Sequence, residues 1–133
     1  MADLPATVIF DTNFLLVPIR FGVDVFAEAE RALNQLVDPA VTPGVLRELE
    51  QLRRGAAPGF ERELDFALSL ASRCRVIELD LMEGETVDDS LVRLASAGGY
   101  VVATTDSELK NKLRRRGVKV LILRQRRYLQ LVG

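Results

Sequence analysis

Two short apolar segments of this chain end directly in an aspartate. Val8–Phe10 is followed by Asp11, and Tyr100–Thr105 is followed by Asp106. Both segments are predicted to be buried strands, and the second is dense in β-branched residues. If the strands are parallel neighbours, both carboxylates emerge at one edge of a sheet, where α/β proteins bind their ligands. Asn13 adds another polar side chain two residues after Asp11.

Each of these aspartates also has a structural interpretation as a helix cap. A carboxylate before a helix can accept hydrogen bonds from the first free N–H groups. This interpretation is the stronger one for Asp106 taken alone, because "SELKNKL" follows it. It is weaker for Asp11, because Asn13 brings a second polar group into a mostly apolar context.

The segment "TVDDSLV" supplies a third candidate carboxylate at the start of a predicted helix. Thr86 and Asp89 fit a capping box, in which the acid reaches back to the backbone of the cap residue. That pairing gives Asp89 a structural role and leaves Asp88 without one. Asp88 can favour the helix dipole, or it can point into the same cleft as the other acids.

A fourth candidate lies on the helix predicted for "VLRELEQL". Glu48 sits beside the apolar stripe formed by Val45, Leu49 and Leu52, whereas Glu50 lies further round the helix. Most helix glutamates are solvated, so it is the position beside the stripe that makes Glu48 a candidate.

A cluster of these carboxylates would suit a hard divalent cation. Two unit charges about 4 Å apart repel by about 4 kcal/mol at an effective dielectric constant of about 20, so the cluster needs a counter-charge. The chain has no histidine and one cysteine, Cys74, which excludes His-ligated and multi-cysteine zinc sites and histidine-based catalysis. Oxygen ligands alone favour Mg²⁺ or Mn²⁺, which commonly serve phosphodiester chemistry.

To bring these residues together, the chain must alternate strands and helices. Further strands are predicted at Arg75–Leu79 and Val118–Leu123. Helices are predicted at 24–37, 42–55, 58–74, 86–98 and 106–117, and the tail 124–133 has no firm assignment. The strands are continuous apolar runs, which favours a parallel sheet covered on both faces. We therefore predict one α/β domain over residues 1–133, with three α/β/α layers and a mainly parallel sheet of about four or five strands.

The charges of the chain are divided along its length. All 19 acids lie at or before Glu108, and the nine basic residues after it are Lys110, Lys112, Arg114, Arg115, Arg116, Lys119, Arg124, Arg126 and Arg127. The helix, strand and tail over 107–133 therefore form a basic segment, which favours contact with a polyanion. A solvated basic surface that offsets an acidic body is the alternative.

Neither a membrane span nor a signal peptide is predicted. No apolar run approaches the roughly 18 residues that cross a bilayer. The N-terminal segment has no basic stretch before its apolar run. We therefore expect a cytoplasmic location.

Taken in order, four pieces of the sequence resemble the PIN-domain ribonucleases. They are Asp11-Thr12-Asn13, "VLRELEQL", "DDSLVRLA" and "ATTDSEL", and the resemblance runs from Val8 to about Leu123. It implies a PIN-like fold and a metal-dependent endoribonuclease whose products carry a 5′-phosphate and a 3′-hydroxyl.

Carried over residue by residue, the resemblance implies that Asp11, Glu48, Asp88 and Asp106 bind Mg²⁺ or Mn²⁺. Asp88 is preferred to Asp89 because it lies eighteen positions before Asp106, the spacing usual in the family. Asn13 and Thr104 match the polar residues that position a carboxylate or a water. The residues expected to contact RNA phosphates are Lys110, Lys112, Arg114, Arg115, Arg124, Arg126 and Arg127.

The stretch from Asp88 to Leu123 is similar, more narrowly, to PIN proteins of small-subunit rRNA processing. A single-stranded or looped rRNA precursor is therefore the expected substrate, with pre-ribosomal proteins as partners. A toxin ribonuclease of the VapC kind, neutralised by an antitoxin, is the first alternative. A non-catalytic RNA-binding PIN subunit is the second, although all four acids are present. The zinc-binding cysteines and histidines of some relatives are absent.

Three further alternatives concern other folds and the oligomeric state. A HAD-type phosphatase also starts with an aspartate after its first strand, but it needs a second aspartate where this chain has Asn13. A nucleotide-binding Rossmann module is disfavoured because no glycine-rich turn follows the first strand. A homodimer through Phe21, Val23 and Phe26 is an alternative to the burial of these residues in the core.

Overall fold

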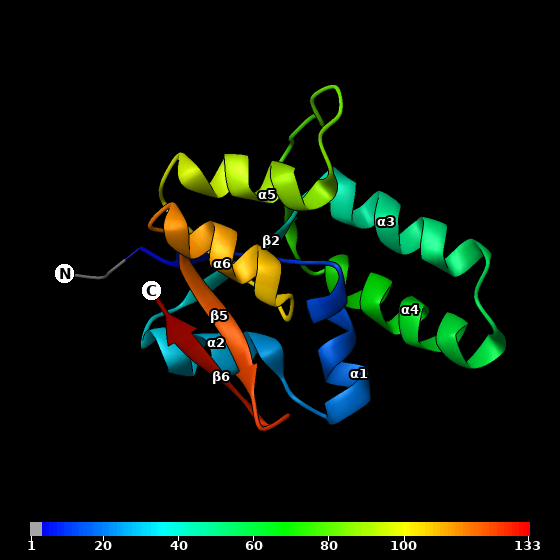
Figure 1. Cartoon of the computed structure of the whole chain (residues 1–133). Helices are drawn as coiled ribbons and strands as arrows, with labels where there is room; N and C mark the ends of the chain where they lie inside the picture. The colour runs from blue at the N-terminus through cyan, green and yellow to red at the C-terminus, as the bar shows by residue number, and fades with distance from the viewer. Residues whose placement is uncertain (1–3) are drawn as a thin grey trace.

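A computed structural model describes residues 4–133 and shows a six-stranded sheet in the order β3-β2-β1-β4-β5-β6 (Figure 1). The first five strands in this order run parallel, and β6 is antiparallel to β5. This confirms a mainly parallel sheet, with more strands than the four or five expected. The strands are β1 (Ala6–Phe10), β2 (Val37–Val41), β3 (Arg75–Val76), β4 (Tyr100–Ala103), β5 (Lys119–Arg124) and β6 (Tyr128–Val132).

Helices cover both faces of the sheet, as the prediction of three layers requires (Figure 1). One face carries α5 and α6, and the other carries η1 and α1 to α4. Their bounds are η1 (Asn13–Leu16), α1 (Val17–Phe21), α2 (Val25–Leu33), α3 (Pro43–Arg54), α4 (Pro58–Ala71), α5 (Val87–Ser96) and α6 (Ser107–Arg115). In the described part of the chain, no helix has the length and apolarity of a membrane span.

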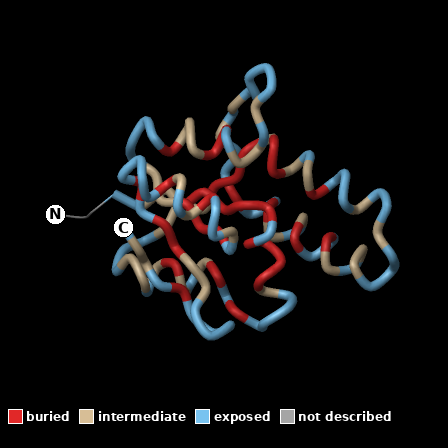
Figure 2. Tube along the Cα trace, in the orientation of Figure 1, coloured by how far each residue is buried: buried red, intermediate tan, exposed pale blue. Residues whose placement is uncertain are grey.

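The core consists of two apolar clusters, one on each face of the sheet. Along β1 the side chains alternate between them: Val8 and Phe10 join the cluster under α2, α3 and α4, and Ile9 joins the cluster under α5 and α6. Figure 2 shows the buried trace concentrated in these central strands. The continuous apolar runs in the sequence are therefore explained by burial on both faces.

The strand β2 lies where the sequence predicted the end of a helix. The helix α2 ends at Leu33, and Asn34 adopts a left-handed conformation with φ 53° that turns the chain. Val37 then pairs with Ala6 of β1. Asp38 and Pro39 are both disfavoured in strands, so this segment lacks a strand pattern although it lies inside the sheet.

The C-terminal tail forms β6 and returns along β5. Gln125 and Arg126 adopt left-handed conformations, with φ 52° and 55°, and the Arg127 N–H donates to the Arg124 carbonyl to close a two-residue turn. The outer edge of β6 is covered by α2. The N–H of Leu129 donates to Glu28 at 3.1 Å, and the carbonyl of Leu129 accepts from Arg31 at 2.7 Å.

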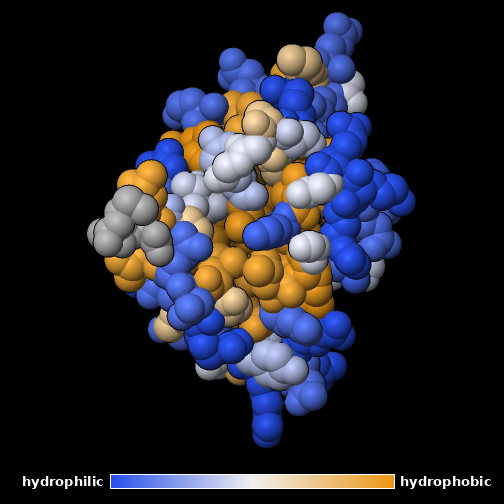
Figure 3. Space-filling view, turned by 90° about the vertical axis from the view of Figure 1, so that its left-hand side faces the viewer, coloured by the Kyte–Doolittle hydropathy of each residue, from blue (hydrophilic) through white to orange (hydrophobic). Residues whose placement is uncertain are grey.

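The N-terminal edge of the parallel strands is partly apolar. Leu4 and Leu36 are largely exposed there, beside the start of β1, where the Ala6 N–H donates to the Leu36 carbonyl. Figure 3 shows this side of the molecule, with apolar side chains at its centre and hydrophilic ones around them. The candidate chemistry described next lies at the opposite edge.

Candidate active site

The two strands that precede these aspartates are parallel neighbours, as predicted, although β4 ends at Ala103 and not at Thr105 as expected. Phe10 of β1 is in register with Ala103 of β4, and the N–H of Asp11 donates to the Ala103 carbonyl at 3.0 Å. Asp11 and Thr104 therefore leave the sheet side by side at its carboxyl edge. The helices α5 and α6 begin near this edge (Figure 1) and bring Asp88 and Asp106 towards it.

Asp11 is the buried centre of the site, with 4% of its surface exposed. One carboxylate oxygen accepts a hydrogen bond from the hydroxyl of Thr104 at 2.8 Å, and the other accepts from the N–H of Thr12 at 2.8 Å. The Thr104 hydroxyl in turn accepts from the N–H of Asp106 at 3.0 Å. Asp11 makes no capping bond to the helix that follows it, so it is held by the site and not by a helix terminus.

Burial raises the pKa of Asp11 to about 6, although hydrogen bonds from Thr104 and Thr12 act in the opposite direction. The charges of Asp88 and, less strongly, Glu48 also raise it. The pKa of Asp88 is raised as well, first by burial and then by the charges of Asp106 and Glu48. The charges of Asp88 and Glu48 therefore act on Asp11, and those of Asp106 and Glu48 act on Asp88.

The structure also separates the two pairs of neighbouring acids. Glu48 is half-buried and Glu50 is exposed; Asp88 is half-buried and Asp89 is exposed. The capping box predicted between Thr86 and Asp89 is present. This placement supports Glu48 and Asp88 as the inward acids.

Asp106 combines the two interpretations that the sequence left open. Its carboxylate caps α6 by accepting from the N–H groups of Glu108 at 2.8 Å and Leu109 at 3.2 Å. The same half-buried carboxylate acts electrostatically on Asp88. A capping role therefore does not remove Asp106 from the acidic cluster.

The donor set is compatible with a hard cation but does not form a closed cage. Within residues 4–133, no group of three or more acidic or cysteine side chains is already arranged to hold one metal ion. Mg²⁺ is commonly bound through one or two carboxylates, with waters and substrate phosphates completing its shell. An open set of mutually repelling carboxylates fits that mode of binding better than a structural ion site.

The triplet Asp11-Thr12-Asn13 contains one further polar group that the sequence analysis did not single out. The hydroxyl of Thr12 is the buried side-chain polar atom that has no hydrogen-bond partner among the described residues. A buried group of this kind needs a water or a ligand to satisfy it. Asn13, by contrast, is exposed and lines a cavity together with Thr104 and Asp106.

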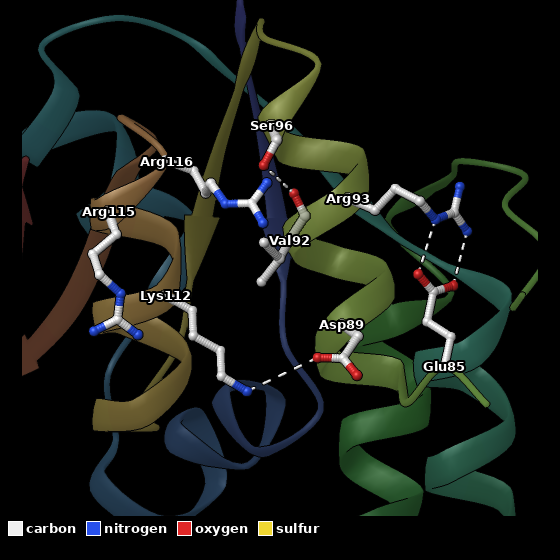
Figure 4. A pocket seen from close by; sticks show the side chains of 8 residues that line it. All are labelled: Glu85, Asp89, Val92, Arg93, Ser96, Lys112, Arg115 and Arg116. Atoms are coloured by element: carbon white, nitrogen blue, oxygen red, sulfur yellow. Dashed lines mark hydrogen bonds and ion pairs between the residues drawn. The ribbon is translucent and has the colours of Figure 1, made fainter.

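The basic segment is distributed over several surfaces. Lys110, Arg124 and Arg126 line the cavity beside Asn13. Lys112 and Arg115 line a second cavity between α5 and α6, where Lys112 approaches Asp89 at 3.9 Å (Figure 4). Arg114 and Arg115 border a third, near the C-terminus, and Arg127 is exposed on the hairpin. The residues expected to contact RNA therefore do not form one continuous track.

The three residues considered for a dimer surface have different environments. Val23 is buried, and Phe26 is half-buried with its ring edge-on to Phe10 at 5.4 Å between centroids. Phe21 is 40% exposed and lines the same cavity as Asn13. Val23 and Phe26 are therefore core residues, whereas Phe21 is available at the surface.

Several known proteins are similar to this chain in sequence or in structure. Ribonuclease VapC4 of Methanocaldococcus jannaschii is 29% identical over 124 residues, covering 92% of this chain and 94% of the relative. The rRNA-processing protein FCF1 of Saccharomyces cerevisiae is 34% identical over 84% of this chain, but the match spans only 56% of that protein. The PIN domain endonuclease Utp24 superposes with a TM-score of 0.78 at 28% identity, covering 96% of this chain and 91% of the other.

The family model described as a PIN like domain matches residues 8–126, which include all four acids and most of the basic segment. The match covers the sheet from β1 to β5 and the helices on both of its faces. This chain therefore belongs to the PIN-like domain family.

Proposed function

We propose that this protein is an endoribonuclease that hydrolyses phosphodiester bonds with the help of Mg²⁺ or Mn²⁺. The observation that carries the proposal is the buried carboxylate of Asp11, which Thr104 holds by a hydrogen bond and on which the charges of Asp88 and Glu48 act. The charge of Asp106 acts in turn on Asp88. Such an arrangement is costly in the free protein, and it becomes favourable when a cation and a substrate phosphate are present.

The residues of the site have separable roles in this reaction. Asp11, Glu48, Asp88 and Asp106 would hold the cation, and Thr104 fixes the orientation of the Asp11 carboxylate through its hydroxyl. When bound, the cation supplies the charge that acidifies an attacking water and stabilises the scissile phosphate. Asn13 and Lys110 line the adjoining cavity and would bind the substrate there.

Single-stranded or looped RNA is the proposed substrate class. Asp106, one of the four acids at the edge of the sheet, lines a cavity of about 640 Å³. The backbone of unpaired RNA can bend into such a cavity, and its bases are free to contact side chains. The cavity also carries Lys110, Arg124 and Arg126, which attract phosphates.

A cleavage assay on single-stranded RNA, with and without Mn²⁺, tests this function. We expect Asp11→Asn to lose cleavage by at least about a hundredfold while it keeps its fold, because a cation ligand is removed. Glu48→Gln should reduce cleavage strongly, and Glu50→Gln, its exposed neighbour on α3, is the matched control. Cleavage by Asp11→Asn at the wild-type rate, or equal losses for the two glutamates, would contradict the assignment.

Within this activity, we propose a role in rRNA processing. The similarity to the rRNA-processing protein FCF1 supports this role. The similarity to VapC4 along almost its whole length supports the second candidate, a toxin ribonuclease with an antitoxin partner. Mapping the 5′ ends of RNA after induced expression separates the two: processing predicts cuts at the ends of rRNA precursors, and a toxin predicts growth arrest that an antitoxin reverses.

A non-catalytic RNA-binding subunit is the remaining candidate. It predicts RNA binding without any Mn²⁺-dependent cleavage, and binding that Asp11→Asn leaves unchanged. The retention of all four acids in one field argues against it, because a protein that only binds RNA gains nothing from mutually repelling carboxylates.

A further inference from the structure

The cavity of about 640 Å³ that Asp106 lines has three features that the four acids do not explain. They are an exposed aromatic ring, three basic side chains without a carboxylate partner and a strained turn. The cavity is lined by Asn13, Thr104 and Asp106, and also by Phe21 of α1 and Arg126 of the hairpin turn. We infer that the part of the cavity around Phe21 is a subsite for one unpaired nucleotide that flanks the scissile phosphate, with its base stacked on Phe21. The inference rests on the proposed function and identifies a contact through which the substrate is held.

The ring of Phe21 is exposed, and the planar guanidinium of Arg126 lies over it. Phe21 is 40% exposed, and the guanidinium carbon of Arg126 lies 5.6 Å from the centre of its ring. A planar guanidinium over a ring occupies the position that a nucleobase takes when it stacks on an aromatic residue. In the complex, the base takes this position and Arg126, which is exposed, turns to the adjoining phosphate.

Three basic side chains that line the cavity are available to bind phosphate. Among the described residues, Lys110, Arg124 and Arg126 make no ion pair with a carboxylate. Arg124 donates to the neutral side chain of Gln130 at 2.6 Å, so its charge is not compensated there. By contrast, Arg20 of the same cavity pairs with Glu63 at 3.0 Å. Three free cations around an exposed ring match the chemistry of a nucleotide.

The backbone that places Arg126 is strained. Gln125 and Arg126 both have positive φ at a two-residue turn that usually contains Asn or Gly. Strain of this kind persists where the rest of the structure holds the residue in place, and it often marks a binding site. The turn therefore keeps a large cationic side chain over Phe21 where a glycine would be more stable.

The first experiment moves one abasic nucleotide along a single-stranded RNA substrate of the protein. In the wild type we expect one flanking position, on one side of the cut, at which loss of the base raises KM roughly tenfold with little change in kcat. In Phe21→Ala, KM for the intact RNA should rise by a similar factor, and the abasic position should add nothing. An abasic profile identical in wild type and Phe21→Ala would overturn the inference.

Two glycine variants of the same turn form a matched pair. Both Gln125→Gly and Arg126→Gly relieve a positive φ, so both should unfold at the same temperature as the wild type or higher. Only Arg126→Gly removes the cation over Phe21, and it alone should raise KM, by roughly fivefold or more. Equal KM values for the two variants would contradict the subsite.

The controls distinguish this inference from the proposed function. Phe21→Leu keeps an apolar side chain at this position but removes the ring. Because the base stacks on the ring, this variant should raise KM as Phe21→Ala does. Its melting temperature, compared with that of the wild type, shows whether the fold is kept. If the wild type cleaves RNA with Mn²⁺ and these variants retain its KM, only the subsite is wrong. If the wild type cleaves no RNA, the proposed function is wrong, and the Kd of the intact and abasic RNAs for wild type and Phe21→Ala still tests the subsite.

Discussion

At the scale of the residue, the cost of ionising Asp11 leads to a prediction about stability. Its pKa is raised to about 6 from the ordinary value of 3.8, so the folded protein disfavours the charged form. This cost is fully present above pH 6, shrinks as the pH falls and is absent below the ordinary pKa. In EDTA at pH 7, Asp11→Asn should therefore be more stable than the wild type by on the order of 1–2 kcal/mol, after the loss of one hydrogen bond.

Urea unfolding at several pH values measures this difference. It should be largest at pH 7 and should be lost by about pH 3, below the ordinary pKa of 3.8, where Asp11 is neutral in both states. Asp89→Asn, which alters an exposed capping acid of the same cluster region, is the comparison, and it should lose stability because its capping bond is weakened. If Asp11→Asn is less stable than the wild type in EDTA at pH 7, burial does not penalise the charged form of Asp11.

The same carboxylate predicts how Mn²⁺ binding depends on pH. A cation must displace the proton that Asp11 holds below pH 6, so the apparent affinity should fall by about tenfold for each pH unit below that value. The measurement is the rise of melting temperature with added Mn²⁺ between pH 5 and pH 8. Asp11→Asn should show little rise at any pH, and a rise equal to that of the wild type would remove Asp11 from the ligand set.

Local sequence rules could identify the acids but not their surroundings. The capping box of Thr86 and Asp89 leaves Asp88 as the inward acid, and the apolar stripe of α3 separates Glu48 from Glu50. Phe21 could not be assigned to the site because its place beside the hairpin turn results from contacts between distant parts of the chain. No spacing in the sequence reports that contact.

At the scale of the element, the edge strand β6 depends on α2. Glu28 accepts from the Leu129 N–H, and Arg31 donates to the Leu129 carbonyl, so the outer edge of β6 has backbone partners in α2 side chains. Glu28→Ala should lower the free energy of unfolding by about 1 kcal/mol, because the Leu129 N–H loses its partner. It should also increase self-association at high protein concentration, because an uncovered strand edge is free to pair.

Urea unfolding and light scattering measure the two effects of this substitution. Glu50→Ala removes a glutamate from the exposed surface of α3 and should change stability by less than about 0.5 kcal/mol. If Glu28→Ala behaves like Glu50→Ala in both measurements, the bonds from α2 do not protect the edge.

The elements that the sequence missed share a physical cause. The strand β2 contains Asp38 and Pro39, and its stability comes from pairing with β1 on one side and β3 on the other. The turn before β6 has Gln125 and Arg126 where hairpin turns usually carry Asn and Gly. Pairing with distant strands overrides the weak local preference of β2, and pairing between adjacent strands does so at the turn before β6. By contrast, α3, α4 and α5 begin near their predicted capping or proline residues.

At the scale of the whole molecule, the basic segment is divided between separate surfaces. Of the nine basic residues after Glu108, Lys110, Arg124 and Arg126 line the cavity beside the acids. Lys112, Arg115 and Arg116 line the cavity between α5 and α6, whose other wall carries Asp89 and the ion pair of Glu85 with Arg93 (Figure 4). Asp89 and Glu85 offset part of the positive charge of that second cavity.

The division predicts a shallow dependence of RNA binding on salt. Each phosphate neutralised on single-stranded nucleic acid contributes about −0.7 to the slope of log K against log salt. Contacts by the three cations of the first cavity give a slope of about −2, whereas engagement of all nine would give about −6. The measurement is the Kd of a short single-stranded RNA over a range of salt concentrations.

Two arginine variants locate the charges that contribute to this slope. Arg126→Ala should reduce its magnitude by about 0.7, because one phosphate contact is lost from the cavity beside the acids. Arg116→Ala removes the same charge from the cavity between α5 and α6 and should leave the slope unchanged. Equal reductions for both variants would mean that RNA follows α6 along its length, since only such a path contacts both surfaces. The structure favours the first cavity because Asp89 and Glu85 offset part of the positive charge of the second.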